Sequence, residues 1–184
     1  MPGPAWLPPQ PWADFTAPLT SGSVSRSAEL LERVLDQFEV EHATRYQPTT
    51  SQTWCNIYVW DGTKALGCEI PHFVNGGVGE NGCKRLHASE QRANDLPRYL
   101  DGDKGKRNGW APCSEEEAAR RVALGFPVVG VWVNLKGSGH TVMCRGPKPG
   151  DPPGLYASGA GRVPTAYGPI AEMLPAPRQF WTHD

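Results

Sequence analysis

The order of patterns along the sequence predicts an α+β protein, with helices first and an antiparallel sheet last. Two helical patterns fill residues 27–67, and two β-rich runs joined by a glycine-containing turn follow at residues 127–144. A chain of 184 residues is long enough for one domain with one hydrophobic core. We therefore expect a single domain over residues 25–184, preceded by an extended arm rich in proline and tryptophan over residues 1–24.

The first two helices are predicted from apolar spacing and from their ends. Ser27 is a favourable N-cap for an amphipathic helix, whose apolar face is Leu30, Leu31, Val34, Leu35 and Phe38. The second helix, from about Thr53 to Leu66, is apolar around most of its circumference, and Gly67 occupies its C-cap position. We expect the second helix to be buried and the first to pack against it.

The remaining elements are shorter. Pro97 favours the start of a short helix that runs through Leu100, and Ser114 with Glu117 forms a capping box for the next helix, closed by Gly125. The glycine-rich segment 68–87 and the charged segment 101–108 are predicted to be loops. The predicted strands are residues 127–133, 140–144, 155–157 and 180–182.

One cysteine, Cys55, stands in the first turn of the second helix. A helix N-terminus carries partial positive charge and unpaired N–H groups, so it favours a thiolate and makes this residue a candidate nucleophile. His140 begins a strand directly after a tight glycine turn and is the candidate general base, which we expect to form an ion pair with the thiol. Gln52 and the N–H of Cys55 are candidates for an oxyanion hole, although Gln52 also fits an exposed loop residue that only faces water.

The segments WCNIYVWD, with Cys55, and GSGHTVMC, with His140, resemble those of papain-like cysteine hydrolases, most closely the CHAP (cysteine, histidine-dependent amidohydrolase/peptidase) and NlpC-type peptidases. The segment from Leu30 through His72 and the terminal FWTHD are similar to a group of phage and bacterial endolysin-like or cell-wall hydrolases. The resemblance covers about residues 27–184. It implies a papain-like fold, with Cys55 as nucleophile, His140 as base and no cofactor or metal.

The resemblance also implies a polar third residue on the strand after the histidine, which would orient the imidazole. That strand holds no Asn, Asp, Glu or Gln. Ser158 is its only small polar candidate, with Tyr156 behind it, so a Cys–His dyad remains the alternative. Trp54 and Asn56, which flank the nucleophile, are expected to line the substrate cleft together with Tyr156.

The resulting expectation is a peptidoglycan hydrolase, an endopeptidase or amidase that cleaves an amide bond of the cell-wall stem peptide. A protein-directed cysteine peptidase or transferase effector is one alternative, and a catalytically degenerate binding module on the same scaffold is another. The expected partner is peptidoglycan or a peptide, and we expect the protein to be a monomer. The near-neutral charge of −1, without a basic block, argues against nucleic acid and anionic membranes as partners.

The sequence contains no apolar stretch of the ~20 residues that a membrane span needs, and no signal-peptide pattern at its start. We therefore expect synthesis in the cytoplasm without a signal peptide, with action on the cell wall after release or export.

A second constellation consists of two Cys-x-x-x-His pairs, Cys68 with His72 and Cys83 with His87, which would suit a zinc clip. The spacing differs from that of common zinc fingers, so this site is the weaker alternative. Elsewhere, we expect Glu69 and His72 to form a structural pair and Arg145 to be exposed to solvent.

Overall fold

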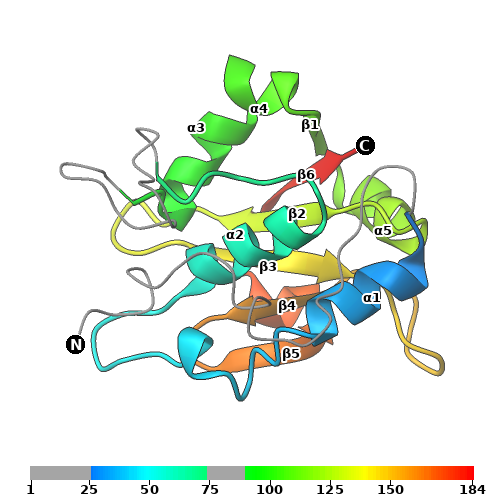
Figure 1. Ribbon diagram of the computed structural model, residues 1–184, viewed down its shortest axis with the longest axis horizontal. Coiled ribbons are helices and arrows are strands. Elements are labelled where there is room, and N and C mark those ends of the chain that lie inside the picture. Colours follow the sequence, from blue (N-terminus) through cyan, green and yellow to red (C-terminus); the bar gives the residue numbers. More distant parts are fainter. Residues whose placement is uncertain (1–25, 74–89) are drawn as a thin grey trace.

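A six-stranded antiparallel sheet forms the centre of the protein, with strand order β1-β6-β2-β3-β4-β5 (Figure 1). The computed structural model describes residues 26–73 and 90–184, so the expected arm at residues 1–24 lies outside the described residues. The strands are β1 (Trp110–Cys113), β2 (Val128–Trp132), β3 (His140–Arg145), β4 (Tyr156–Ala160), β5 (Pro164–Pro169) and β6 (Gln179–His183). The mixture of helices with an antiparallel sheet confirms the predicted α+β class.

Helices surround this sheet. They are α1 (Ala28–Asp36), α2 (Cys55–Ala65), α3 (Leu96–Leu100), α4 (Asp103–Arg107), α5 (Glu115–Ala123) and α6 (Ile170–Met173), with 3-10 turns η4 (Thr44–Tyr46) and η6 (Ala93–Asp95). Helix α2 runs across β3 and β4, and α1 lies beside it on the same face (Figure 1). The two are predicted correctly, including the Ser27 cap, whose hydroxyl accepts a hydrogen bond from the Leu30 N–H at 3.1 Å.

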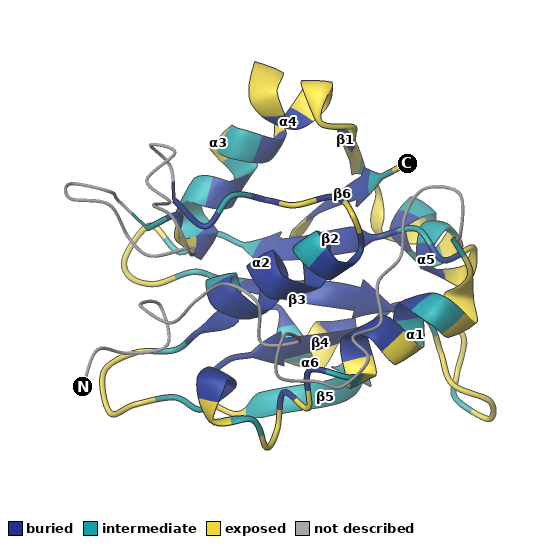
Figure 2. Ribbon diagram, viewed as in Figure 1, coloured by how far each residue is buried: buried dark blue, intermediate teal, exposed yellow. Residues whose placement is uncertain are grey.

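The core lies between α2 and the middle of the sheet. Most residues of α2 are buried, as are those of β2, β3 and β4 (Figure 2). Gly62 of α2 lets the helix approach β3, because a Cβ at this position would lie 3.2 Å from Cγ of Met143. Side chains alternate between the two faces of a strand, so Thr141, Met143 and Arg145 face α1 and α2, whereas His140 and Val142 face the other side.

Several elements differ from the sequence expectations. The charged segment 101–108 contains the short helix α4 rather than only a loop, and β1, β5 and α6 were not predicted at all. Both missed strands contain proline, which ordinarily argues against a strand. They are tolerated here because β1 and β5 are the two edges of the sheet, where one side of a strand has no ladder partner.

Candidate functional site

The start of α2 is attached to the end of β4. The backbone N–H of Trp54 donates to the carbonyl of Ala160 at 3.2 Å, and the indole Nε1 of Trp54 donates to the carbonyl of Gln47 at 2.8 Å. Trp54 is itself buried, so both bonds are shielded from water. These contacts place Cys55, the first residue of α2, beside the edge where β3 begins and β4 ends.

The Cys55 thiol is buried, with 5% of the residue exposed. Burial raises the pKa of this thiol, because a thiolate loses its hydration in the protein interior. The opposing influences come from the backbone N–H groups of Thr141, Asn56 and Cys55 itself, and from the Thr53 hydroxyl, all of which favour the thiolate. The Cys55 sulfur thus faces the backbone of β3 one residue away from His140.

The His140 imidazole lies against two glycines at the end of β4. A Cβ on Gly161 would lie 3.0 Å from Cε1 of this ring, and a Cβ on Gly159 would lie 3.6 Å from Nε2. Gly161 therefore leaves space that the ring occupies, whereas the contact at Gly159 is an ordinary van der Waals distance. Burial lowers the pKa of His140 from 6.5 to about 4, so the imidazole is neutral at physiological pH.

The start of α2 and the start of β3 therefore lie at the same end of the sheet, but the His140 side chain is not among the residues that line the cleft beside Cys55. The carbonyl that anchors the helix start belongs to Ala160, which lies between the two glycines under the histidine ring. Both residues are described, and no hydrogen bond joins the Cys55 sulfur to the His140 ring in this structure. Burial raises the pKa of the thiol and lowers that of the imidazole, and both shifts oppose the expected ion pair. In the resting protein these shifts favour a neutral Cys55 thiol and a neutral His140 imidazole.

Ser158, which was expected to orient the His140 imidazole, has a different hydrogen-bond partner. Its hydroxyl hydrogen-bonds with the Tyr58 hydroxyl at 2.7 Å, inside the interface between α2 and β4. The reason is strand alternation: the ring of His140 lies at positions 159 and 161, so the side chain of residue 158 points to the other face. Ser158 therefore does not orient His140.

Tyr156 is also placed away from the nucleophile. Its ring stacks on Tyr167 with centroids 4.8 Å apart, and its hydroxyl donates to the carbonyl of Pro152 at 3.2 Å. Tyr156 is not among the residues that line the cleft beside Cys55. The expectation that it shapes the substrate cleft is therefore wrong.

A polar cleft of about 610 Å³ opens over the start of α2. Three residues expected in the site, Gln52, Trp54 and Asn56, line it together with Cys55. Among the described residues, the Gln52 side chain has no hydrogen-bond partner, so its amide is free to contact a ligand. The rest of the lining is Ser51, Thr53, Glu90, Arg92, Ala93, Asn94, Gly137, Ser138, Gly139 and Arg162.

Asparagine side chains fix one wall of this cleft. The amide of Asn94 donates to the carbonyls of Asn134 and Gly137, both at 2.9 Å, and its oxygen accepts from the Asn134 N–H. Asn56 donates to the carbonyl of Gln91 at 3.3 Å, which ties the helix start to the same wall.

Glu90, Arg92 and Arg162 line the cleft without having been predicted. Glu90 and Arg92 lie on the segment before η6 and Arg162 follows β4, and no spacing rule connects these residues to Cys55. Only the folded chain brings these charges together.

The expectations for Glu69, His72 and Arg145 also differ from the structure. Glu69 accepts from the Trp60 indole at 2.8 Å, while His72 pairs with Glu90 at 2.8 Å, so the expected Glu69–His72 pair is wrong. Arg145 is buried rather than exposed, and it binds Glu32 and Asp36 of α1 and the carbonyl of Ala166.

The structure describes only one half of the alternative zinc site, Cys68 and His72, because Cys83 and His87 lie outside the described residues. Of the other half, the Cys68 thiol donates to the carbonyl of Thr63 at 3.3 Å and His72 is engaged with Glu90. Within residues 26–73 and 90–184, no three His, Cys, Asp or Glu side chains gather as metal ligands.

Comparison with known proteins assigns no family to the fold and site described above. No protein-family model matches the chain, and the search of curated proteins finds no match. Across the part of the chain that is described, no helix is both long and apolar enough to cross a bilayer.

Proposed function

We propose that the protein is a cysteine-dependent amide hydrolase of papain-like type that acts on the stem peptide of peptidoglycan. The observation that supports the proposal is that the Cys55 sulfur, at the start of α2, faces the Thr141 N–H next to His140 and opens on a polar cleft. A nucleophile at a helix start with a neutral imidazole nearby is the arrangement that amide cleavage through an acyl-enzyme requires.

The first step begins from the neutral pair. As the Cys55 sulfur forms a bond to the substrate carbonyl carbon, its proton moves to the His140 ring, and the carbonyl π electrons move to oxygen. A substrate that fills the cleft brings thiol and imidazole into productive alignment, since hydrogen bonds at resting sites often tighten only when substrate binds. A charged pair then exists only during reaction, which is consistent with the burial of both groups.

The negative oxygen of the tetrahedral intermediate needs preorganised donors. The N–H groups of the first turn of a helix have no intrahelical acceptor, and Cys55 supplies one of them. The free amide of Gln52 on the cleft wall supplies the second donor. This keeps the oxyanion role that the sequence predicts for Gln52.

Collapse of the intermediate breaks the C–N bond, and protonated His140 gives its proton to the leaving amine. The neutral ring then takes a proton from water, whose oxygen attacks the thioester carbonyl and releases the acid and the Cys55 thiol. The chain supplies no polar side chain at positions 159 and 161, which face the ring, so the machinery is a Cys–His dyad whose imidazole is held by packing.

The test is hydrolysis of purified cell walls and of isolated muropeptides. We expect Cys55→Ala and His140→Ala each to lower turnover by a factor of about 10³ or more, because each removes one partner of the covalent mechanism. Cys113→Ala and His42→Ala are matched controls on other elements and are expected to retain wild-type rates. Full activity of Cys55→Ala would exclude the mechanism.

The same site supports a second candidate, a binding module that uses the cleft without chemistry. The observation in its favour is that positions 159 and 161, which face His140, are glycines, and no hydrogen bond from another described residue orients the ring. In that case wild type and Cys55→Ala would bind muropeptides equally, and neither would release a new amine. Parallel incubation with protein substrates, followed by mass spectrometry, separates a protein-directed peptidase from both.

A further inference from the structure

The cleft beside Cys55 contains unused hydrogen-bond donors that carry positive charge. Its charged lining consists of Arg92, Arg162 and Glu90. The Glu90 carboxylate is already engaged, because it contacts His72 Nε2 at 2.8 Å and also interacts with the side chain of Asn56. Burial raises the pKa of Glu90, but the contacts with His72 and Asn56 and the charge of Arg92 outweigh it and lower the pKa, so this group stays a carboxylate.

Arg162 is anchored by one end of its guanidinium. Its Nη1 donates to the carbonyls of Thr49 at 2.8 Å and Thr50 at 3.3 Å, in the loop that precedes α2. Arginine has five N–H donors, so the Nε and Nη2 edge keeps three of them, and the contacts of the described residues provide no acceptor for that edge. This edge has the geometry that binds a carboxylate through two parallel hydrogen bonds.

Arg92 belongs to the opposite wall. It directly precedes η6, whose Asn94 is bonded to the loop at residues 134–137, whereas Arg162 is bonded to the loop before α2. Arg92 is exposed, and no hydrogen bond among the described residues provides an acceptor for its guanidinium. Two guanidinium groups thus border the cleft from separate walls, and each has N–H groups without an acceptor among the described residues.

We propose that Arg162, opposed by Arg92, binds a carboxylate of the ligand in the cleft next to Cys55. The proposal deepens the proposed function, on which it rests for the identity of the ligand: the preferred substrate carries a free carboxylate close to the scissile amide. Arg162 is a specificity-determining residue, and Arg92 adds attraction from the other wall.

The first experiment measures this selectivity without hydrolysis. Iodoacetate and iodoacetamide both alkylate a cysteine thiolate, forming a C–S bond and releasing iodide, but only iodoacetate carries a carboxylate. Because both reagents attack the same thiolate, the ratio of their rates cancels changes in thiol pKa and access. Mass spectrometry of the peptide that contains Cys55 gives this ratio, and Cys113, outside the cleft, serves as the internal reference thiol.

We expect the iodoacetate-to-iodoacetamide ratio at Cys55 to exceed that at Cys113 and to fall with added salt. Arg162→Gln and Arg92→Gln should each lower the ratio at Cys55 by about three- to fivefold, as expected for one exposed charge contact. Arg98→Gln is the matched control, because Arg98 has 80% of its side chain exposed and lies outside the cleft. An unchanged ratio in both cleft variants would overturn the proposal.

The second experiment uses paired peptide substrates that differ only in a carboxylate or carboxamide next to the cleaved bond. Arg162→Gln should raise KM for the acid and leave KM for the amide unchanged. Arg162→Lys should not restore the wild-type KM for the acid, because lysine lacks the two-donor edge of arginine. The two proposals fail separately. A shifted alkylation ratio without hydrolysis would refute the hydrolase, and hydrolysis without discrimination between acid and amide would refute carboxylate recognition.

Discussion

At the residue scale, burial controls the chemistry of Cys55 and His140. A buried thiol resists losing its proton, and a buried imidazole resists gaining one, so desolvation shifts the two pKa values in opposite directions. The helix start reduces the shift at sulfur through its N–H groups but does not reverse it. In the proposed mechanism, the thiolate is therefore generated during the reaction, by proton transfer to His140.

The pH profile follows from the lowered pKa of His140. The base must be neutral, and its pKa is about 4 instead of 6.5, so kcat/KM should stay level from neutral pH down to about pH 5 and fall only as the pH approaches 4. A series of initial rates at constant ionic strength checks this. An acid limb centred near pH 6.5 would contradict it and would indicate a solvated imidazole.

The pH dependence of folding stability provides a second test of the lowered pKa of His140. The unfolded chain protonates His140 at its ordinary pKa of 6.5, while the folded state resists protonation until about pH 4. The contribution of the neutral His140 ring to the free energy of unfolding is therefore complete above pH 6.5 and is lost as the pH falls through 4. His140→Ala should remove this part of the acid sensitivity of the free energy of unfolding.

At the element scale, α2 is held on its outer side by a buried ion pair with η4. Asp61 accepts from Arg45 Nε at 2.7 Å, from Arg45 Nη2 at 3.1 Å and from the Tyr46 hydroxyl at 2.8 Å. Both charges are withdrawn from water, and burial raises the pKa of Asp61 to about 6. This network attaches α2 to the segment that precedes the cleft loop.

Asp61→Asn is expected to destabilise the fold by about 3–5 kcal/mol, because it leaves the Arg45 charge buried without its partner. Urea denaturation followed by tryptophan fluorescence measures the loss. Arg120→Gln removes one partner of an ion pair on the exposed face of α5 and should leave the midpoint nearly unchanged. Equal effects of the two substitutions would contradict the assigned role of Asp61.

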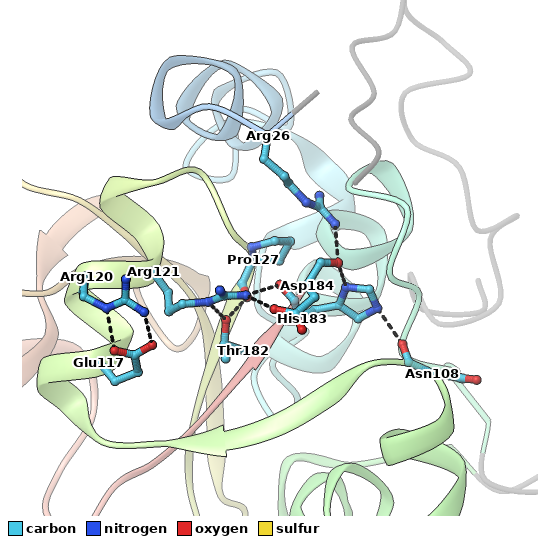
Figure 3. Close-up of polar contacts among 9 residues, drawn as sticks. All are labelled: Arg26, Asn108, Glu117, Arg120, Arg121, Pro127, Thr182, His183 and Asp184. Atoms are coloured by element: carbon cyan, nitrogen blue, oxygen red, sulfur yellow. Dashed lines mark hydrogen bonds and ion pairs between the residues drawn. The ribbon is translucent and has the colours of Figure 1, made fainter. Parts of the chain in front are cut away.

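At the scale of the whole molecule, the last strand of the chain lies inside the sheet. Strand β6 pairs with β1 on one side and β2 on the other. Figure 3 shows how Arg121 of α5 reaches this strand, with bonds to the Thr182 hydroxyl, the His183 carbonyl and the Asp184 carboxylate. The His183 ring in turn hydrogen-bonds with the carbonyl of Asn108, before β1.

Arg121→Met should loosen this end of the sheet, because it removes all three contacts of the guanidinium with residues 182–184. We expect faster amide hydrogen exchange in β1 and β6, with little change in β3 and β4 beside Cys55. Arg120→Met is the matched control on the neighbouring helix position, since Arg120 forms its ion pair with Glu117 of the same helix and not with β6 (Figure 3). Equal changes in hydrogen exchange across the whole sheet would contradict a local role of Arg121 at β1 and β6.

The sequence by itself determined the α+β class, the helix that begins at Cys55 and the strand that begins at His140. These features follow from local causes: apolar periodicity, capping by Ser27 and Ser114, and a glycine turn before a β-rich run. Only the tertiary structure decided which side chains share a site. Strand alternation turned Ser158 away from His140, and long-range packing brought Glu90, Arg92 and Arg162 around the cleft, because charges on unrelated loops have no local pattern.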